Sequence, residues 1–310
     1  MKLLKWVVGV LLWLSVGFFL IPTDNYFIDL LQSFTFHAVL VYLSLTCIFA
    51  FLRWRNLAAS GVSVCFLLAA HLLPHIINSS SADYEVDGKA FRVAHFNILA
   101  SNTSYEKSIR KALSTDADLI SFQEVNIRWI NQLIEKLETD YPYYAFVDGE
   151  VHGVAVFSRF PLEDIRQYYW TGEPTLTGNV ILDDKNIHFV TTHTLSPRSP
   201  ERSRNRNLHL QKVTEYITKV KGPVLAIGDF NTVPWSKPIT HMKEHAQLRD
   251  SRNGLVPTFP AEYQLGIPID YILHSDEISC LKFDAVDSAG SDHRGVIGEY
   301  AFSASKAAAI

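Results

Sequence analysis

The chain has 310 residues, of which 48% are hydrophobic and 19% charged, and its formal net charge is −4. This charge excludes a global basic field that would draw the protein onto nucleic acid, although a local basic groove is compatible with it. Only Cys280 lies outside the apolar N-terminal region, which excludes a disulfide framework and a cysteine zinc site in the rest of the chain.

Three apolar stretches occupy the start of the chain, at residues 3–21, 34–52 and 57–77. Each is close to the ~20 residues that cross a bilayer as a helix. A cleavable signal peptide is the alternative for the first stretch, but no small-x-small cleavage site follows it. We therefore predict a membrane anchor over residues 1–77 with three transmembrane helices, the first of them uncleaved.

The charged residues of this anchor predict its orientation. Basic residues precede the first apolar stretch and separate the second from the third: Lys2, Lys5, Arg53 and Arg55. The loop between the first two stretches carries Asp24 and Asp29 but no lysine or arginine. The positive-inside rule then places the N-terminus in the cytoplasm, and three crossings bring the chain after residue 77 to the outer side.

Residues 78–90 begin with small polar side chains and are predicted to form a short linker, and residues 303–310 form an alanine-rich tail. Between them, residues 91–302 alternate segments of strand-like and helix-like pattern. The predicted strands are 91–97, 118–122, 143–147, 153–158, 178–182, 187–192, 224–227, 269–273 and 296–300, and the predicted helices are 104–113, 126–138 and 204–219. This alternation predicts an α/β domain with mostly buried sheets.

Polar residues cluster at the ends of these strands. They are Asn97, Gln123 and Glu124, His193, Asp229 and Asn231, Asp270, and finally Asp292 and His293. Carboxylates and amides delivered repeatedly to one edge of a sheet can hold a hard cation such as Mg²⁺ or Mn²⁺. Taken singly, Asn97 can also cap a strand, and Asp229 with Asn231 can form a polar turn before Pro234.

Taken together and in this order, these segments resemble the endonuclease/exonuclease/phosphatase superfamily. The resemblance spans residues 91–300 and includes the strand and turn at residues 153–161. It implies a four-layer sandwich of two packed mixed β-sheets flanked by helices, here preceded by the three transmembrane helices. The chain is most similar to bacterial proteins of this architecture, which implies a multi-pass protein of the bacterial inner membrane with a periplasmic catalytic domain.

The resemblance also implies roles for individual residues. Glu124 would be the principal ligand of Mg²⁺ or Mn²⁺, completed by Asn97 and Asp292. His293, oriented by Asp270, would contact the scissile phosphate as general acid and base. Leu99 stands where some nucleases carry an acidic residue, which leaves a second, weaker metal position without that ligand.

Further residues would act on the substrate. Asp229 would align or deprotonate the attacking water, Asn231 would hold a phosphate oxygen, and His193 would stabilise charge on the phosphoryl oxygens. Arg198 and Arg202 are candidates for anionic headgroup or phosphate contacts. The alternative for the run Arg198, Arg202, Arg204 and Arg206 is a solvated helix start, and His152, His188 and His209 are taken as structural.

These observations predict a membrane-anchored, metal-dependent phosphodiesterase or phosphatase acting on the outer side. The short linker and the absence of a global positive charge favour a membrane-proximal phosphoester such as a lipid headgroup. Two alternatives stay open: a metal-dependent nuclease, for which basic loops are expected, and a non-catalytic membrane-held module that binds phosphate. The cluster Tyr168, Tyr169 and Trp170 lines a substrate edge or simply packs, and the oligomeric state is not indicated.

Overall fold

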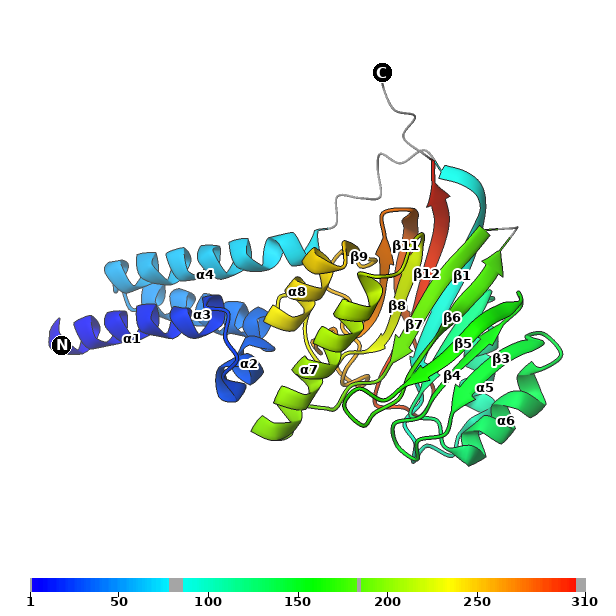
Figure 1. Ribbon diagram of the computed structural model, residues 1–310. Coiled ribbons are helices and arrows are strands. Elements are labelled where there is room, and N and C mark those ends of the chain that lie inside the picture. Colours follow the sequence, from blue (N-terminus) through cyan, green and yellow to red (C-terminus); the bar gives the residue numbers. More distant parts are fainter. Residues whose placement is uncertain (1, 78–85, 183–184, 305–310) are drawn as a thin grey trace, which may run out of the picture.

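The structure is a computed structural model that describes residues 2–77, 86–182 and 185–304. A bundle of helices projects from one side of a sandwich of sheets and helices, with the N-terminus at its far end (Figure 1). Most of the predicted linker, residues 78–85, and residues 305–310 of the predicted tail lie outside the described residues.

The projecting bundle, which we call the anchor, consists of α1 (Lys2–Leu20), α2 (Tyr26–Gln32), α3 (Thr35–Phe51) and α4 (Arg55–Ile76). Within the described residues, α1 and α4 are each long and apolar enough to cross a membrane, and α2 with α3 makes a third span if the bent pair is taken as one. Helices α2 and α3 are bent by 68° relative to each other. The short helix α2 begins where the Asn25 side chain accepts hydrogen bonds from two backbone N–H groups of its first turn.

The described strands form two six-stranded sheets. The first sheet has the order β11 (Ile278–Val286), β12 (Gly295–Ser303), β1 (Val86–Asn97), β2 (Leu119–Gln123), β4 (Val154–Ser158) and β3 (Tyr143–Val147). The second has the order β5 (Leu162–Tyr168), β6 (Thr175–Leu182), β7 (Lys185–Thr192), β8 (Val224–Asp229), β10 (Asp270–Ser275) and β9 (Leu248–Asp250). Both sheets are mixed, since β1 pairs in parallel with β2, and β7 with β8.

Apolar side chains from both sheets fill the space between them, including Val156, Phe189 and Ile227. Helices α5 (Tyr105–Leu113) and α6 (Ile127–Leu137) cover the outer face of the first sheet. Helices α7 (Pro200–Ile217) and α8 (Lys237–His245) cover the second sheet and lie next to the anchor (Figure 1). The predicted four-layer sandwich is confirmed.

The strands that the sequence pattern did not predict, β5, β9 and β11, are all at sheet edges. Edge strands expose much of their length, so β5 carries charged residues where a central strand carries apolar ones. Strand β1 begins at Val86, inside the segment predicted as linker, because Val86 and Asp87 pair with Ser303 and Phe302. The helices α2 and α8 were also not predicted, being seven and nine residues long.

Candidate active site

Sheet register brings the candidate residues together. Asn97 and Gln123 are partners at the carboxyl ends of the parallel strands β1 and β2. Asp229, the last residue of β8, is the antiparallel partner of Asp270, the first residue of β10. Register thus pairs two strand termini within each sheet, and the hydrogen bond from Asn97 Nδ2 to Asp229 Oδ2 at 3.2 Å joins the two pairs across the sheets.

Gln123 joins the two sheets beneath this site. Its Nε2 donates to the Thr192 carbonyl at 2.7 Å, and its Oε1 accepts from the Asp229 backbone N–H at 2.8 Å. The backbone at position 228 passes close to Thr192 and to the Gln123 side chain, and its φ is 147°, so this position requires glycine. A Cβ there would lie 2.1 Å from the Thr192 oxygen and 2.3 Å from the Gln123 Nε2.

Gly228→Ala is therefore expected to destabilise the sandwich of sheets and helices. The backbone conformation alone costs about 1–3 kcal/mol for a residue with a Cβ, and the clash with Gln123 and Thr192 adds to it. The matched control is Gly222→Ala, because Gly222 also has a positive φ but no atom lies within 4 Å of the place that its Cβ would take. Thermal unfolding should show the larger loss for Gly228→Ala; equal losses would contradict the crowding argument.

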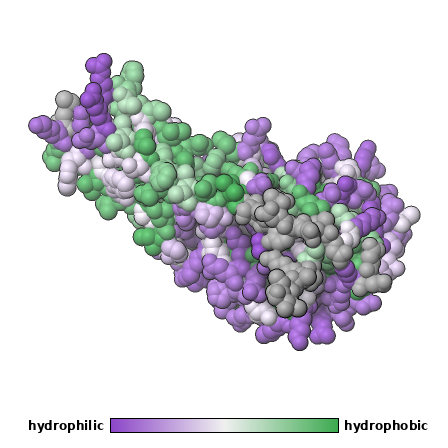
Figure 2. All heavy atoms as spheres, turned by 90° about the horizontal axis from the view of Figure 1, so that it is seen from above, coloured by the Kyte–Doolittle hydropathy of each residue, from purple (hydrophilic) through white to green (hydrophobic). Residues whose placement is uncertain are grey.

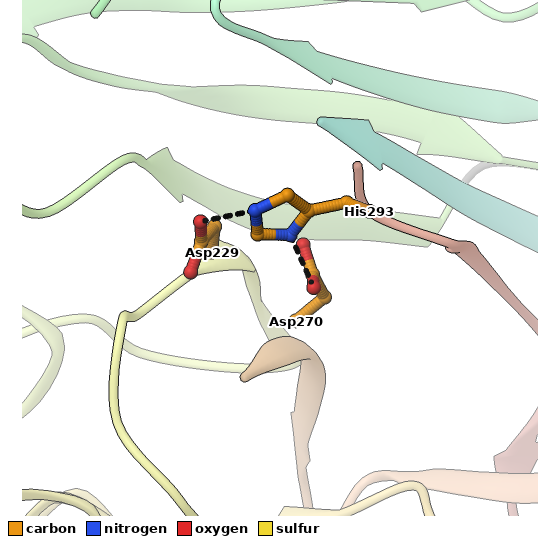
Figure 3. A group of neighbouring side chains, drawn as sticks. All are labelled: Asp229, Asp270 and His293. Atoms are coloured by element: carbon orange, nitrogen blue, oxygen red, sulfur yellow. Dashed lines mark hydrogen bonds and ion pairs between the residues drawn. The ribbon is translucent and has the colours of Figure 1, made fainter. Parts of the chain in front are cut away.

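His293 lies between two buried carboxylates (Figure 3). Its Nδ1 donates to Asp270 Oδ2 at 2.9 Å, and its Nε2 lies 3.6 Å from Asp229 Oδ2. Burial alone would lower the pKa of His293, but the charges of Asp270 and Asp229 raise it to about 10. The imidazole is therefore held as a cation with both nitrogens carrying protons.

Asp270 stays ionised although it is completely buried. Burial opposes its charge, but the charge of His293 and hydrogen bonds from His293 and His95 hold the pKa of Asp270 below its ordinary value. The His95 contact joins Nε2 to Asp270 Oδ1 at 3.2 Å. His95 was not among the residues singled out in the sequence, because it lies within β1 and not at its end.

The pKa of Asp229 is shifted in the opposite direction from that of Asp270. Burial raises its pKa to about 8; His293 opposes this shift, while Asp270 and Glu124 add to it. Its Oδ1 accepts from the Asn231 backbone N–H at 2.8 Å, and its Oδ2 accepts from Asn97 Nδ2 at 3.2 Å. In its ionised form, which the charge of the His293 cation favours, this carboxylate can take a proton from a bound water.

Glu124 follows β2 with a φ of 60°, which turns its side chain out of the sheet. Its Oε1 accepts from Asn97 Nδ2 at 3.1 Å and its Oε2 from the Ala100 N–H at 3.1 Å. His193 Nε2 lies 4.0 Å from Glu124 Oε1 and 3.6 Å from Asp229 Oδ2. Burial lowers the pKa of His193, so this ring is neutral beside its charged neighbours.

These groups open into a cavity of about 540 Å³. The predicted residues that line it are Glu124, His193, Arg198, Arg202, Asp229, Asn231, Asp292 and His293. His152 also lines it, with its ring centroid 5.2 Å from that of His193, although the sequence placed His152 among structural histidines. His188 and His209 do act structurally, each hydrogen-bonded to neighbouring side chains.

Some predicted side chains are tied to the protein in this structure. Asn231 Nδ2 donates to the Thr194 carbonyl at 2.9 Å, and Arg202 Nε donates to the Ser196 carbonyl at 3.0 Å. Arg206 departs from the solvated run in which the sequence placed it: it is buried, and its Nη1 donates to the Asn231 carbonyl at 2.8 Å. Tyr168 and Trp170 pack on each other and on Tyr216 of α7.

The donor set fits a divalent cation. Oxygen and nitrogen atoms of Asp229, Asp270 and His293 lie within 4.8 Å of one another, a spacing that suits a metal ion. His293 would have to lose a proton to be a ligand, so the carboxylates are the donors available to a cation. Glu124 faces the same cavity, and its negative charge helps to raise the pKa of Asp229, so added positive charge stabilises the site. Asn97 presents its amide nitrogen to the carboxylates, and its oxygen would face a cation only after rotation of the amide.

The fold and this site define a phosphoester hydrolase. The model of the Endonuclease/Exonuclease/phosphatase family matches residues 94–293, and the chain belongs to this family. A search of curated proteins finds no match. The family resemblance expected from the sequence is thereby confirmed.

Solved structures share the fold at low sequence identity. An endonuclease/exonuclease/phosphatase from Beutenbergia cavernae is 19% identical with a TM-score of 0.58, over 70% of this chain and 72% of that chain. D. rerio TDP2 complexed with single-strand DNA product is 12% identical with a TM-score of 0.57, over 69% of this chain and 99% of that chain. Sphingomyelinase C from Streptomyces griseocarneus is 16% identical with a TM-score of 0.55, over 68% of this chain and 99% of that chain.

Proposed function

We propose that this protein is a membrane-integral, metal-dependent phosphoester hydrolase that cleaves a lipid headgroup on the outer side of the membrane. The observation that carries the proposal is the composition of the catalytic cavity. Leu30, Ser33 and Phe34 of the anchor line it together with Glu124 and His293. A sphingomyelinase and a protein complexed with single-strand DNA product share the fold, so the fold alone does not select the substrate.

The surface supports a position in the membrane. Hydrophobic residues cover the anchor in Figure 2, whereas hydrophilic residues dominate the catalytic domain and the far tip of the anchor. The basic residues of that tip, Lys2, Lys5, Arg53 and Arg55, line one cavity with Trp6 and Trp54. Cations and tryptophans gathered at the end farthest from the catalytic domain support a cytoplasmic tip and an outer catalytic domain.

We assign Glu124 and Asp292 as ligands of Mg²⁺ or Mn²⁺, with Asn97 as a third ligand once its amide oxygen is turned toward the ion. Both carboxylates face the cavity, and Asp292 is exposed within reach of solvent and substrate. A bound divalent cation neutralises charge on phosphate oxygens. Its binding would also relieve the crowding of negative charge at Asp229 and Glu124.

The side chains divide the remaining chemistry. Asp229 aligns the attacking water and accepts its proton, which the raised pKa of this carboxyl favours. His293, held by Asp270, presents its Nε2 proton to the phosphate and passes it to the leaving oxygen. Neutral His193 and the amide of Asn231 add hydrogen bonds to the phosphoryl oxygens, and Arg198 and Arg202 attract the anionic headgroup.

Product release by the full-length protein in detergent tests the proposal. The substrates are phospholipids, sphingomyelin, phosphoinositides, RNA, and single- and double-stranded DNA, each with Mg²⁺, Mn²⁺ or a chelator. We expect metal-dependent cleavage of a lipid, and we expect Glu124→Gln to raise the metal concentration needed by roughly 10-fold or more. Glu135→Gln, on the exposed face of α6, is the control and should behave as wild type.

Two other outcomes would replace the proposal. Cleavage of nucleic acid with no cleavage of lipid would make the protein a nuclease. Metal binding, measured by calorimetry, with no cleavage of any substrate would favour a membrane-held module that binds phosphate groups without turnover.

A further inference from the structure

The catalytic cavity has two unlike halves. One half is polar, with Glu124, Asp229 and His293 at its base. The apolar half of the lining includes Leu30 and Phe34 from the anchor with Phe259, Ile267 and Ile269 from the catalytic domain. It begins beside the catalytic histidine, because the rings of Phe259 and His293 have their centroids 4.9 Å apart. The halves are continuous within one space of about 540 Å³, so a single molecule can contact both.

The anchor's side of the apolar half is held in place by specific contacts. The Trp235 indole N–H donates to the Gln32 carbonyl at 2.7 Å, at the end of α2. His37 Nε2 donates to the Leu265 carbonyl at 2.6 Å, which fixes the start of α3 beside the loop that carries Phe259 and Ile267. The bend between α2 and α3, where Ser33 and Phe34 lie, is therefore docked on the catalytic domain.

The same part of the anchor also has an outward apolar face. Leu30 and Phe34 are 37% and 45% exposed while lining the cavity, and Leu31 and Phe27 beside them are 40% and 72% exposed outside it. In a membrane-anchored chain these exposed apolar side chains meet the interfacial region of the bilayer. The apolar half of the cavity is thus adjacent to the surface from which a lipid would enter.

We propose that Leu30 and Phe34 bind the hydrocarbon chain of the substrate, so that the enzyme acts on lipids whose scissile phosphate is close to an acyl or isoprenoid chain. The anchor then supplies part of the substrate site as well as attachment to the membrane. This inference rests on the proposed hydrolase function, and it names the part of the lipid that the cavity recognises.

Chain-length dependence of hydrolysis tests the inference. The full-length protein in detergent is given p-nitrophenyl phosphodiesters whose second ester carries a methyl, butyl or octyl chain, with Mn²⁺. For wild type, kcat/KM should rise by up to about fourfold for each methylene that enters the apolar half. Leu30→Ala and Phe34→Ala should lower the octyl-to-methyl ratio of kcat/KM at least fivefold relative to wild type.

Leu31→Ala and Phe27→Ala are the matched controls, because they remove the same side chains from the same region outside the cavity. Partitioning of the octyl substrate into detergent is the same for all variants, so only a change in the ratio reports on the cavity. If Leu30→Ala and Phe34→Ala keep the wild-type ratio, the inference is wrong, whatever the rate on the methyl diester.

A binding measurement separates this inference from the hydrolase function. Calorimetry with octylphosphonate and methylphosphonate should show tighter binding of the octyl compound to wild type, and a reduced difference in Leu30→Ala and Phe34→Ala. Such a result without cleavage of any diester would support binding of the hydrocarbon chain by Leu30 and Phe34, and it would overturn the proposed hydrolase function. Equal binding of the two phosphonates by the wild-type protein would show that the cavity does not bind a hydrocarbon chain, and the inference would be wrong.

Discussion

Replacing His293 with alanine is expected to lower kcat by about 10²–10⁴, the range that a single general acid–base group supplies. The imidazole Nε2 lies 3.6 Å from Asp229 Oδ2, and Asp270 fixes the orientation of the ring through Nδ1. No other histidine in the described part of the chain lies between two buried carboxylates in this way. The rate should be measured on whichever phosphoester the wild type cleaves, at saturating metal.

Two variants make this result specific. His241→Ala removes an exposed histidine of α8 and should leave kcat unchanged. Asp270→Asn keeps the shape of the Asp270 side chain but removes the charge that raises the pKa of His293, so it should also lower kcat strongly. Metal binding by His293→Ala, followed by calorimetry, should persist; a loss of metal affinity equal to that of Glu124→Gln would show that His293 is a ligand instead.

Asp29→Ala is expected to destabilise the protein by about 3–5 kcal/mol, because it leaves the Arg206 charge buried without its partner. Asp29 Oδ2 accepts from Arg206 Nη2 at 2.7 Å, and the two side chains are 7% and 1% exposed. Arg206 also holds the Asn231 carbonyl through Nη1. A shift of Asn231 by about 1 Å should cost on the order of 10²-fold in kcat.

A second ion pair between the anchor and the catalytic domain provides the control. Asp24 pairs with Lys237 at 2.5 Å, but these side chains are 74% and 48% exposed. Exposed pairs contribute about 0–1 kcal/mol, so Asp24→Ala should have little effect on thermal unfolding or on kcat. Equal effects of Asp24→Ala and Asp29→Ala would contradict the importance of burial.

A double variant separates stability from positioning. Asp29→Leu with Arg206→Met replaces the buried pair by apolar side chains of similar size, which often restores or raises stability. The Asn231 carbonyl nevertheless loses its donor. We expect this variant to unfold near the wild-type temperature while kcat stays low. If both the unfolding temperature and kcat return to wild-type values, Arg206 affects catalysis only by stabilising the fold.

The positions of the candidate site residues could be predicted because they stand at the ends of strands with clear apolar patterns. Asn97 and Asp229 end buried central strands, and Asp270 begins one. The edge strand β5 was missed because its charged residues face solvent and give no alternating pattern. Metal ligation by Glu124, Asn97 and Asp292 remains a prediction.

Contacts between the anchor and the site could not be derived from local pattern. The sequence placed Asp29 in a loop that helped to orient the membrane helices, and Arg206 in a solvated basic run. Their pairing depends on a docking of two parts of the chain that only the tertiary structure shows. The same holds for Leu30 and Phe34, whose place in the cavity depends on the bend between α2 and α3.

The docking of α2 has a consequence for biosynthesis. Asp29 is separated from its partner Arg206 by 177 residues, and Gln32 is separated from Trp235 by 203. At ribosomal rates of about 5–20 residues per second, roughly 10–40 s pass between synthesis of α2 and synthesis of these partners. During that interval Asp29 lacks its partner Arg206, so its carboxylate must stay solvated. The last step in placing α2 is therefore the folding of the catalytic domain against it.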